Sequence, residues 1–248
     1  MDTGHSANSS PKGVFLTAEW RHLVMLNYEV DPGLLLKSIP AGTELDQWNG
    51  KTFLSLVGFR FLNTKVFGTP FPFHRNFEEV NLRFYVRRQE QEEIRRGVVF
   101  IREIVPRWAI ATVARTVYNE NYVSLPMSYQ IQTKDSSELV VEYTWKTGIR
   151  WNRIGLSVKG NPALPKASSE EQFITEHYWG YAAQRDHGCT EYRVAHPAWG
   201  VWSGENVVVE GDMEELYGKE LAAVLRNPPT SAFLADGSEV TVSRGRKL

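Results

Sequence analysis

Residues 77–88, FEEVNLRFYVRR, decide the fold class, because their polar and apolar side chains alternate. Successive residues of a β-strand point to opposite sides, so one face of this strand would be apolar and the other would carry Glu79, Asn81 and Arg83. Two interpretations stay open. In an ordinary antiparallel sheet the polar face meets solvent. In a sheet closed on itself, the polar face would instead line an interior wide enough for a ligand.

The segments on either side extend this strand into a β-rich fold. Runs rich in β-branched and aromatic residues predict further strands at 22–30, 52–67, 97–105, 127–133, 138–147, 149–158, 191–195, 207–210 and 239–243. Gly58 interrupts one of these runs and predicts a bend or bulge. Helices are expected at 32–38, at 107–117, from 169 toward 177 and at 213–225, with Asp212 as a cap for the last. Strands and helices do not alternate regularly, which favours a mostly antiparallel sheet closed or half-closed on itself.

Composition bounds the function classes. The chain has 248 residues, of which 42% are hydrophobic, and we expect a flexible tail at 1–13 followed by a single domain at 14–248. Its 28 Lys and Arg against 29 Asp and Glu give a net charge of −1, so neither nucleic acid nor a membrane surface is an expected partner. A lone cysteine, Cys189, and no visible secretory signal make the cytoplasm the expected location.

No sequence motif points to a cofactor or metal. The chain has no phosphate-binding loop and no nucleophile elbow, and its histidines lack the spacing of a zinc site, so we expect no cofactor and no metal. The informative signal is charge inside apolar runs, at Arg60, Arg102–Glu103 and Glu142. A buried charge must be paired, so any of these that face inward should meet one another or a ligand.

Five motifs carry a resemblance to a known family. They are WRH at 20–22, LNY at 26–28, VGFRF at 57–61, FHRNFEEVNLRFYV at 73–86 and FITEHYWG at 173–180. These resemble the uncharacterised bacterial family catalogued as domain of unknown function 2071, from about Thr17 to the C-terminus. That family is similar, more distantly, to the acetoacetate decarboxylase-like superfamily. The resemblance implies a mainly β (α+β) fold, a mostly antiparallel cone-shaped β-barrel or half-barrel with a few peripheral helices around a cavity.

The resemblance also implies site residues. The active-site arginine of the decarboxylases falls on Arg21, and one active-site glutamate falls on Glu79, near Arg83. Their imine-forming lysine and its neighbouring lysine fall at 121–123, NYV, where this chain has no lysine. Imine formation requires an activated amine, as in acetoacetate decarboxylase itself. We therefore expect the fold without the imine chemistry.

The leading hypothesis is a protein that binds a small organic acid or related metabolite in a cavity around Arg21, Glu79 and Arg83, with His74 and Glu78 as further ligand-binding residues. His74 and Glu78 belong to the densest polar cluster of the sequence, which surface salt bridging explains equally well.

Catalysis would need an acid or base beside the bound carboxylate. In an enzyme of the lyase or hydrolase type, Arg21 would hold the carboxylate, Glu79 would be the general acid or base and Tyr122 would donate in place of the missing lysine. The alternative is a non-catalytic structural or interaction module in which Arg21 and Glu79 form a buried pair. A homo-oligomer is also possible, with aromatic side chains such as Trp199 and Trp202 available for assembly.

Overall fold

The computed structural model describes residues 13–70, 74–106, 121–134 and 137–248. In this part of the chain, one sheet has twelve strands and a second sheet has four. The strands of the first sheet are β1 (Val14–Val30), β2 (Glu44–Leu45), β3 (Thr52–Val66), β4 (Thr69–Pro70), β5 (Phe77–Glu90), β6 (Glu93–Val105), β7 (Tyr122–Ser124), β11 (Trp179–Ala183), β12 (Cys189–Ala195), β13 (Val201–Ser203), β15 (Ser231–Ser243) and β16 (Arg246–Lys247).

The four-stranded sheet consists of β8 (Met127–Lys134), β9 (Glu138–Thr147), β10 (Arg150–Lys159) and β14 (Glu205–Glu210). The described helices are α2 (Glu170–Thr175), α3 (Glu214–Leu225) and two short 3-10 turns, η1 (Pro32–Leu34) and η2 (Leu36–Ser38). None of the helices in the described ranges is long and apolar enough to cross a membrane.

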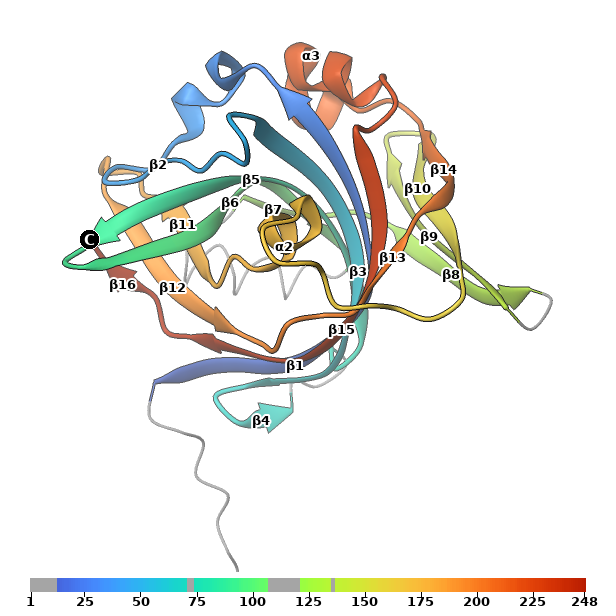
Figure 1. Cartoon of the computed structure of the whole chain (residues 1–248), viewed down its shortest axis with the longest axis horizontal. Helices are drawn as coiled ribbons and strands as arrows, with labels where there is room; N and C mark the ends of the chain where they lie inside the picture. The colour runs from blue at the N-terminus through green and yellow to red at the C-terminus, as the bar shows by residue number, and fades with distance from the viewer. Residues whose placement is uncertain (1–12, 71–73, 107–120, 135–136) are drawn as a thin grey trace, which may run out of the picture.

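The twelve-stranded sheet closes on itself. Its path runs β15–β1–β3–β5–β6–β11–β12, and β12 pairs again with β15 through Val194–Val242 and Ala195–Thr241. Most neighbouring strands are antiparallel, whereas β6 pairs with β11 in parallel. Figure 1 shows the strands of this closed sheet, called the ring below, curving around the middle of the molecule. Helix α2 lies inside the ring in this view. The structure therefore has the mostly antiparallel, closed sheet that the sequence favoured.

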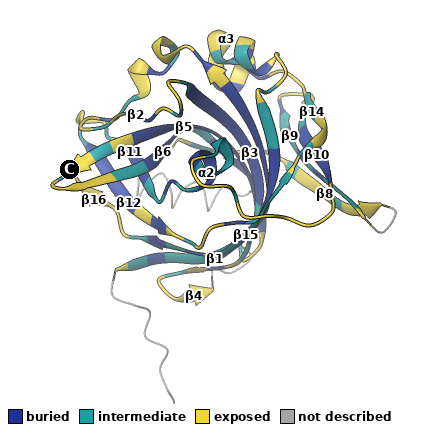
Figure 2. Cartoon of the chain, viewed as in Figure 1, coloured by how far each residue is buried: buried dark blue, intermediate teal, exposed yellow. Residues whose placement is uncertain are grey.

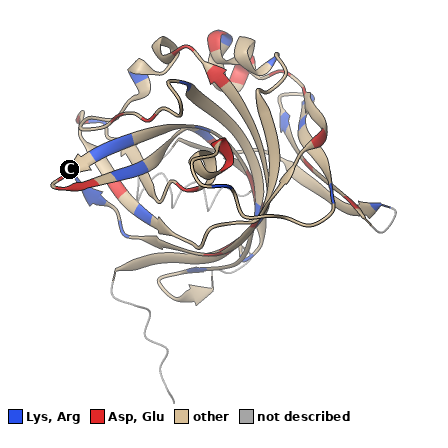
Figure 3. Cartoon of the chain, viewed as in Figure 1, with Lys and Arg blue, Asp and Glu red and all other residues tan. Residues whose placement is uncertain are grey.

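Ion pairs tie β12 to its neighbours β6 and β16. Glu191 on β12 is only 2% exposed and accepts from Arg95 on β6 at 2.9 Å, from Arg246 on β16 at 3.0 Å and from the Tyr181 hydroxyl on β11 at 3.2 Å. Figure 3 shows basic residues gathered at the outer end of the β5–β6 hairpin, beside these strands. A buried carboxylate with several charged donors is compensated for its desolvation, so this cluster ties β12 to β6, β11 and β16.

Three apolar clusters form in the described part of the chain, and the two larger ones lie on the two sides of the ring wall. The larger lies between the outer side of β1, β3 and β5 and the four-stranded sheet, and contains Tyr143 and Trp145 of β9, both fully buried. The other lies inside the ring, where α2 contributes Phe173 and Ile174. Figure 2 shows burial concentrated on β3 and β5, because both of their faces are covered.

Most predicted strands and helices are found in the structure, although β1 and β15 begin at Val14 and Ser231, well before the predicted 22 and 239. The helix predicted at 32–38 is the pair of 3-10 turns η1 and η2, with Asp31 capping the first. The helix predicted at 107–117 lies outside the described residues. Gly58 lies at the predicted bulge, although the extra residue is on the partner strand β1. A side chain at Gly58 would come within 2.6 Å of the Tyr143 ring, so glycine also permits the close approach of β3 and β9.

Two β-bulges decide which side chains enter the ring. In β1 the register with β3 shifts between Arg21 and Val24, where His22 adopts a positive φ of 55°. In β6 the register with β5 shifts between the partners of Leu82 and Arg83, because Ile101 is an extra residue. An inserted residue reverses the alternation of side chains beyond it. Trp20 and Leu23 therefore share one side of the sheet, as do Phe100 and Glu103.

Candidate functional site

A cavity of about 120 Å³ opens inside the ring. Its walls come mainly from aromatic and aliphatic side chains of β1, β3, β5, β6, β12 and β15, and its described lining residues are Phe15, Leu16, Trp20, Leu23, Phe59, Phe61, Thr64, Val66, His74, Phe77, Glu79, Asn81, Arg83, Phe100, Glu103, Tyr122, Tyr192, Val194 and Val242. A largely apolar cavity with a few converging polar groups is the usual form of a small-molecule site.

The polar face of β5 supplies the charged part of this cavity. Glu79, Asn81 and Arg83 are 2%, 1% and 7% exposed, and all three line the cavity. The solvent-facing interpretation of this strand is therefore wrong, and the interior-facing one is confirmed. The reason is the ring closure, which turns the polar face of β5 inward, while the four-stranded sheet covers the apolar face.

Glu79 lies in a site that disfavours its charge. Burial raises its pKa from the ordinary 4.5 to about 7, although hydrogen bonds from Asn81 and Tyr122 and the charge of Arg83 act in the opposite direction. Asn81 donates from Nδ2 to Glu79 Oε1 at 2.9 Å, and the Tyr122 hydroxyl donates to Oε2 at 3.1 Å. A carboxyl group with a pKa near neutrality suits proton transfer at physiological pH.

A second carboxylate, Glu103, approaches the same tyrosine. Glu103 is 2% exposed, lies opposite Asn81 on the neighbouring strand β6 and is a second acceptor within reach of the Tyr122 hydroxyl. Burial is the largest of the effects that raise the pKa of Tyr122 far above its ordinary value, and the two carboxylates add to it. Tyr122 therefore stays protonated and is a donor at this end of the cavity.

Arg83 is a buried cation without a hydrogen-bonded acceptor. Within the described residues its Nε–H is buried and makes no hydrogen bond, and its charge lowers the pKa of the nearby Glu79 carboxyl. The guanidinium also lies 5.9 Å from the centre of the Tyr85 ring. Arginine keeps its charge when buried, so an unfilled donor here carries a desolvation penalty that an anionic ligand would offset.

The structure brings four of the six predicted site residues to the cavity. Glu79, Tyr122, Arg83 and His74 line it. Glu78 is 8% exposed but lies on the opposite side of β5, where its charge acts on the Tyr143 hydroxyl. This placement follows from strand alternation, which separates Glu78 from Glu79.

Arg21 does not reach the cavity. It contacts Glu19 at 3.2 Å, Asp236 at 3.6 Å and the carbonyl oxygen of Gly237 at 3.2 Å. Trp20 points into the ring, so Arg21 points away from it, and the bulge at His22 turns Leu23 rather than Arg21 inward. The expected cavity around Arg21 and the expected buried Arg21–Glu79 pair are both absent from this structure.

Of the other charges inside apolar strands, Glu103 is the one that lines the cavity. Arg60 lies 4.1 Å from the centre of the Tyr129 ring, and Glu142 pairs with Arg153 at 3.4 Å, both toward the four-stranded sheet. The sequence marked Glu103 as a charge in an apolar run, but not as a site residue. Glu103 points into the cavity because of the bulge at Ile101, which the sequence did not predict.

A second buried polar group lies apart from this cavity. His177 of the FITEHYWG motif is 6% exposed, and its Nε2 lies 3.0 Å from Asp46 Oδ2, which also accepts from Arg96 at 2.7 Å. Burial lowers the pKa of His177 to about 4, so this histidine is neutral at pH 7. Phe173 and Tyr85 pack on its imidazole, which indicates a structural role for His177 inside the closed sheet.

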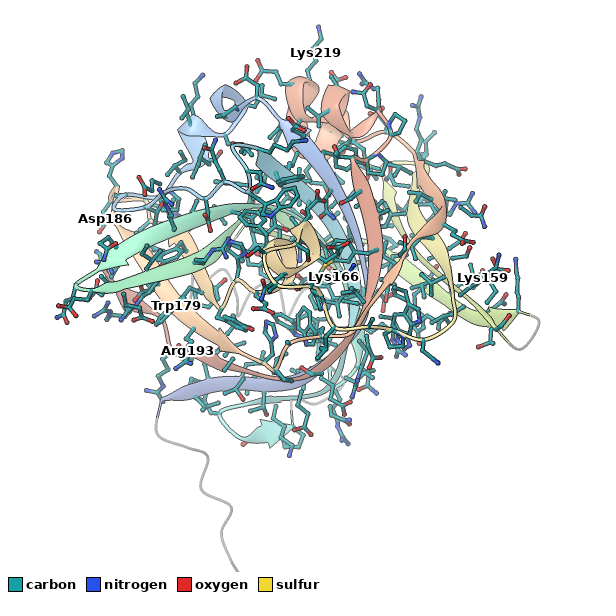
Figure 4. The ribbon with its side chains drawn as sticks, in the orientation of Figure 1. Lys159, Lys166, Trp179, Asp186, Arg193 and Lys219 are labelled. Carbon is teal, nitrogen blue, oxygen red and sulfur yellow. The ribbon has the colours of Figure 1, made fainter. Side chains whose placement is uncertain are left out.

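No lysine is found among the described residues that line the cavity. The residues expected at the position of the decarboxylase lysines are Asn121, Tyr122 and Val123, at the start of β7. Every lysine in the described ranges is exposed or half-buried, and Figure 4 shows Lys159 and Lys219 at the edge of the molecule.

Comparison with known proteins places the fold. The acetoacetate decarboxylase of Legionella pneumophila superimposes with a TM-score of 0.63 at 15% identity, over 100% of this chain and 92% of that one. An acetoacetate decarboxylase-like enzyme of Sphingomonas wittichii RW1 gives 0.65 at 12% identity, over 99% of both chains. The enduracididine biosynthesis enzyme MppR, complexed with pyruvate, gives 0.65 at 13% identity, over 98% and 93%. The chain thus has an acetoacetate decarboxylase-like fold.

Sequence comparison gives the family. The uncharacterized protein YqjF of Bacillus subtilis (strain 168) is 32% identical over 80 residues, which make up 32% of this chain and 33% of that protein. The match therefore spans about a third of the length of this relative. The model of the domain of unknown function 2071 family, described as an uncharacterized conserved protein, matches residues 17–239. The chain belongs to the domain of unknown function 2071 family.

Proposed function

We propose that the cavity binds a small organic acid, with the ligand carboxylate on Arg83 and its apolar part against the aromatic walls. The observation that carries this proposal is the buried Arg83 guanidinium, whose Nε–H has no acceptor among the described residues. A carboxylate accepts from a guanidinium in a bidentate geometry that few other groups match. Phe59, Phe61 and Phe77 offer the apolar surface beside it.

The cavity volume limits the ligand. About 120 Å³ is similar to the roughly 150 Å³ of a protein cavity that accommodates benzene. A ligand of about six non-hydrogen atoms therefore fits. Pyruvate has this size, and the similar fold of MppR is described in complex with it, which supports a short 2-oxo or 3-oxo acid as the first ligand class to test.

Glu79 and Tyr122 suit acid–base chemistry on such a ligand. Glu79 has a pKa of about 7, so it holds or releases a proton near neutral pH, and Tyr122 holds its proton and donates. Imine formation is not part of the proposal, because the cavity has no lysine among its described lining residues.

Thermal melts with and without a panel of short oxo acids test the binding proposal. We expect wild-type protein to melt at a higher temperature with a fitting acid and not with its uncharged amide, because binding to the folded state stabilises it. Arg83→Gln should lose the effect, and Arg21→Gln, which changes an arginine outside the cavity, should keep it. A stabilisation that Arg83→Gln retains would refute the proposal, and absence of any stabilisation would favour the non-catalytic module. Consumption of the stabilising acid, followed by NMR, reports turnover.

A further inference from the structure

Strand β8 is an open edge of the four-stranded sheet. The order β14–β10–β9–β8 leaves β8 with β9 as its sole strand neighbour in the described part of the chain. The β8–β9 hairpin projects from the rest of the molecule on the right of Figure 1. Tyr129 is 41% exposed even though it lies on the side of the sheet that faces the core, and the Arg60 guanidinium packs on its ring.

The hydrogen bonds of β9 reveal which backbone groups of β8 point outward. Lys146 N donates to the carbonyl oxygen of Pro126, and these two residues continue the β8–β9 register of Met127 with Trp145. Antiparallel pairs alternate between hydrogen-bonded and non-hydrogen-bonded. The even-numbered residues of β8 therefore bond to β9, and the odd-numbered residues turn their N–H and C=O groups to the open edge. Those residues are Met127, Tyr129, Ile131 and Thr133.

This edge lacks the usual protection against pairing. Edge strands are commonly blocked by charged residues, proline or bulges. Pro126 precedes β8 and Lys134 ends it, but residues 127–133 between them contain neither charge nor proline, and the register of β8 with β9 is regular from Met127 to Lys134. The opposite edge differs, because β14 begins and ends with Glu205 and Glu210, and its register with β10 shifts.

We propose that β8 pairs antiparallel with β8 of a second copy of this chain, around a two-fold axis at Gln130. In this register the outward residues meet one another, with Tyr129 opposite Ile131 of the second copy and Met127 opposite Thr133. All outward N–H and C=O groups of the four residues then find partners. The two four-stranded sheets become one continuous eight-stranded sheet.

The chemistry of the edge favours a second copy over an unrelated strand. An aromatic and a β-branched side chain are a favourable cross-strand pair, and the two-fold axis creates the Tyr129–Ile131 pair twice. No like charges meet along residues 127–133, whereas two copies of β14 in the same arrangement would bring glutamates together. A single strand pair is a small interface, so the expected dimer is weak and concentration-dependent.

Trp199 and Trp202, which the sequence suggested for assembly, do not form an alternative interface. Trp199 is 3% exposed and stacks on His196 at 4.0 Å, so the prediction that it is available on the surface is wrong. Trp202 is half-buried and donates to the carbonyl oxygen of Gly160.

A pair of cysteine variants tests the register. In the proposed dimer Gln130 faces itself across a non-hydrogen-bonded pair, with Cα atoms about 4.5 Å apart, which is within reach of a disulfide. The two copies of Gln132 would be separated by roughly 13 Å, which is beyond it. We expect Gln130→Cys to form a disulfide-linked dimer under mild oxidation and the matched Gln132→Cys to remain unlinked. The native Cys189 is 1% exposed and does not interfere.

Sedimentation equilibrium tests the edge itself. We expect wild-type protein to dimerise with rising concentration and Ile131→Pro to stay monomeric, since this proline removes an outward N–H that β9 does not use. Circular dichroism confirms that the variant is folded. A monomeric wild-type protein, a dimer that persists in Ile131→Pro, or equal cross-linking of the two cysteine variants would each overturn the proposal.

Discussion

Replacing Glu79 by glutamine should stabilise the protein at alkaline pH. Burial raises the Glu79 pKa from 4.5 to about 7, so between these pH values the folded state holds a proton that the unfolded state has released. The folded state therefore loses stability as pH rises through this window. One pKa unit corresponds to ~1.4 kcal/mol, so the loss reaches about 3 kcal/mol near pH 7 and above. Glutamine carries no charge, so the Glu79→Gln variant does not lose this stability as pH rises.

The surrounding hydrogen bonds can adapt to the amide. The hydroxyl of Tyr122 can donate to the glutamine oxygen as it does to Glu79. Asn81 donates from Nδ2 at present, and its Oδ1 is buried with no acceptor role in the described residues. A flip of the Asn81 amide would let Oδ1 accept from the new glutamine N–H. The substitution thus leaves no donor facing a donor. The stability difference between the two proteins therefore comes mainly from the desolvation of the Glu79 charge, which the variant lacks.

Urea denaturation of both proteins from pH 4.5 to 8.5 measures this difference. We expect equal free energies of unfolding at the acidic end and a gap that grows toward about 3 kcal/mol at the alkaline end, with Glu79→Gln the more stable. Glu220→Gln, which removes an exposed carboxylate of α3, controls for the general effect of one charge and should follow wild type. A Glu79→Gln variant that is less stable at every pH would refute the reasoning, because it would make Glu79 an ionised partner of Arg83.

Three further predictions concern packing and ligand. Gly58→Ala should lower the free energy of unfolding by about 1–3 kcal/mol in urea denaturation, because its Cβ would lie 2.6 Å from the Tyr143 ring, and unchanged stability would contradict the close approach. Affinity for a short carboxylate, measured by calorimetry, should fall as pH rises above about 7, because Glu79 then becomes a like charge beside the ligand, and a flat profile would exclude Glu79 from the site. Borohydride treatment with 2-oxo or 3-oxo acids should leave the intact mass unchanged, and an adduct on any lysine would restore the imine route.

The alternation in residues 77–88 predicted the two faces of β5, but not which of them faces solvent. Strand alternation is local, so Glu79, Asn81 and Arg83 could be placed on one face from sequence. Their inward direction depends on the pairing of β12 with β15, more than 100 residues along the chain, and on the four-stranded sheet that covers the other face. Long-range pairing of this kind leaves no local sequence signal.

Strand alternation and bulges explain the site residues that sequence reasoning misplaced or missed. One inserted residue reverses inward and outward for the residues beyond it, and its position depends on the partner strand. Arg21 follows the inward-pointing Trp20 and therefore lies outside, although the resemblance assigned it to the site, and the bulge beside His22 directs Leu23 inward instead. The bulge at Ile101 brings Glu103 and Phe100 into the cavity together. Glu103 carried a usable signal, a charge in an apolar run, and Arg21 carried none that distinguished it from a surface residue.

The Nε–H resonance of Arg83 tests the central claim most directly. In the ligand-free protein this buried group has no acceptor among the described residues, and Arg83→Gln identifies its signal by removing it from the NMR spectrum. On titration with pyruvate or another short oxo acid that raises the melting temperature, we predict a saturable downfield shift of this resonance, as expected for a new hydrogen bond to a carboxylate. An unchanged Arg83 resonance at saturation, with shifts confined to residues elsewhere, would contradict the account.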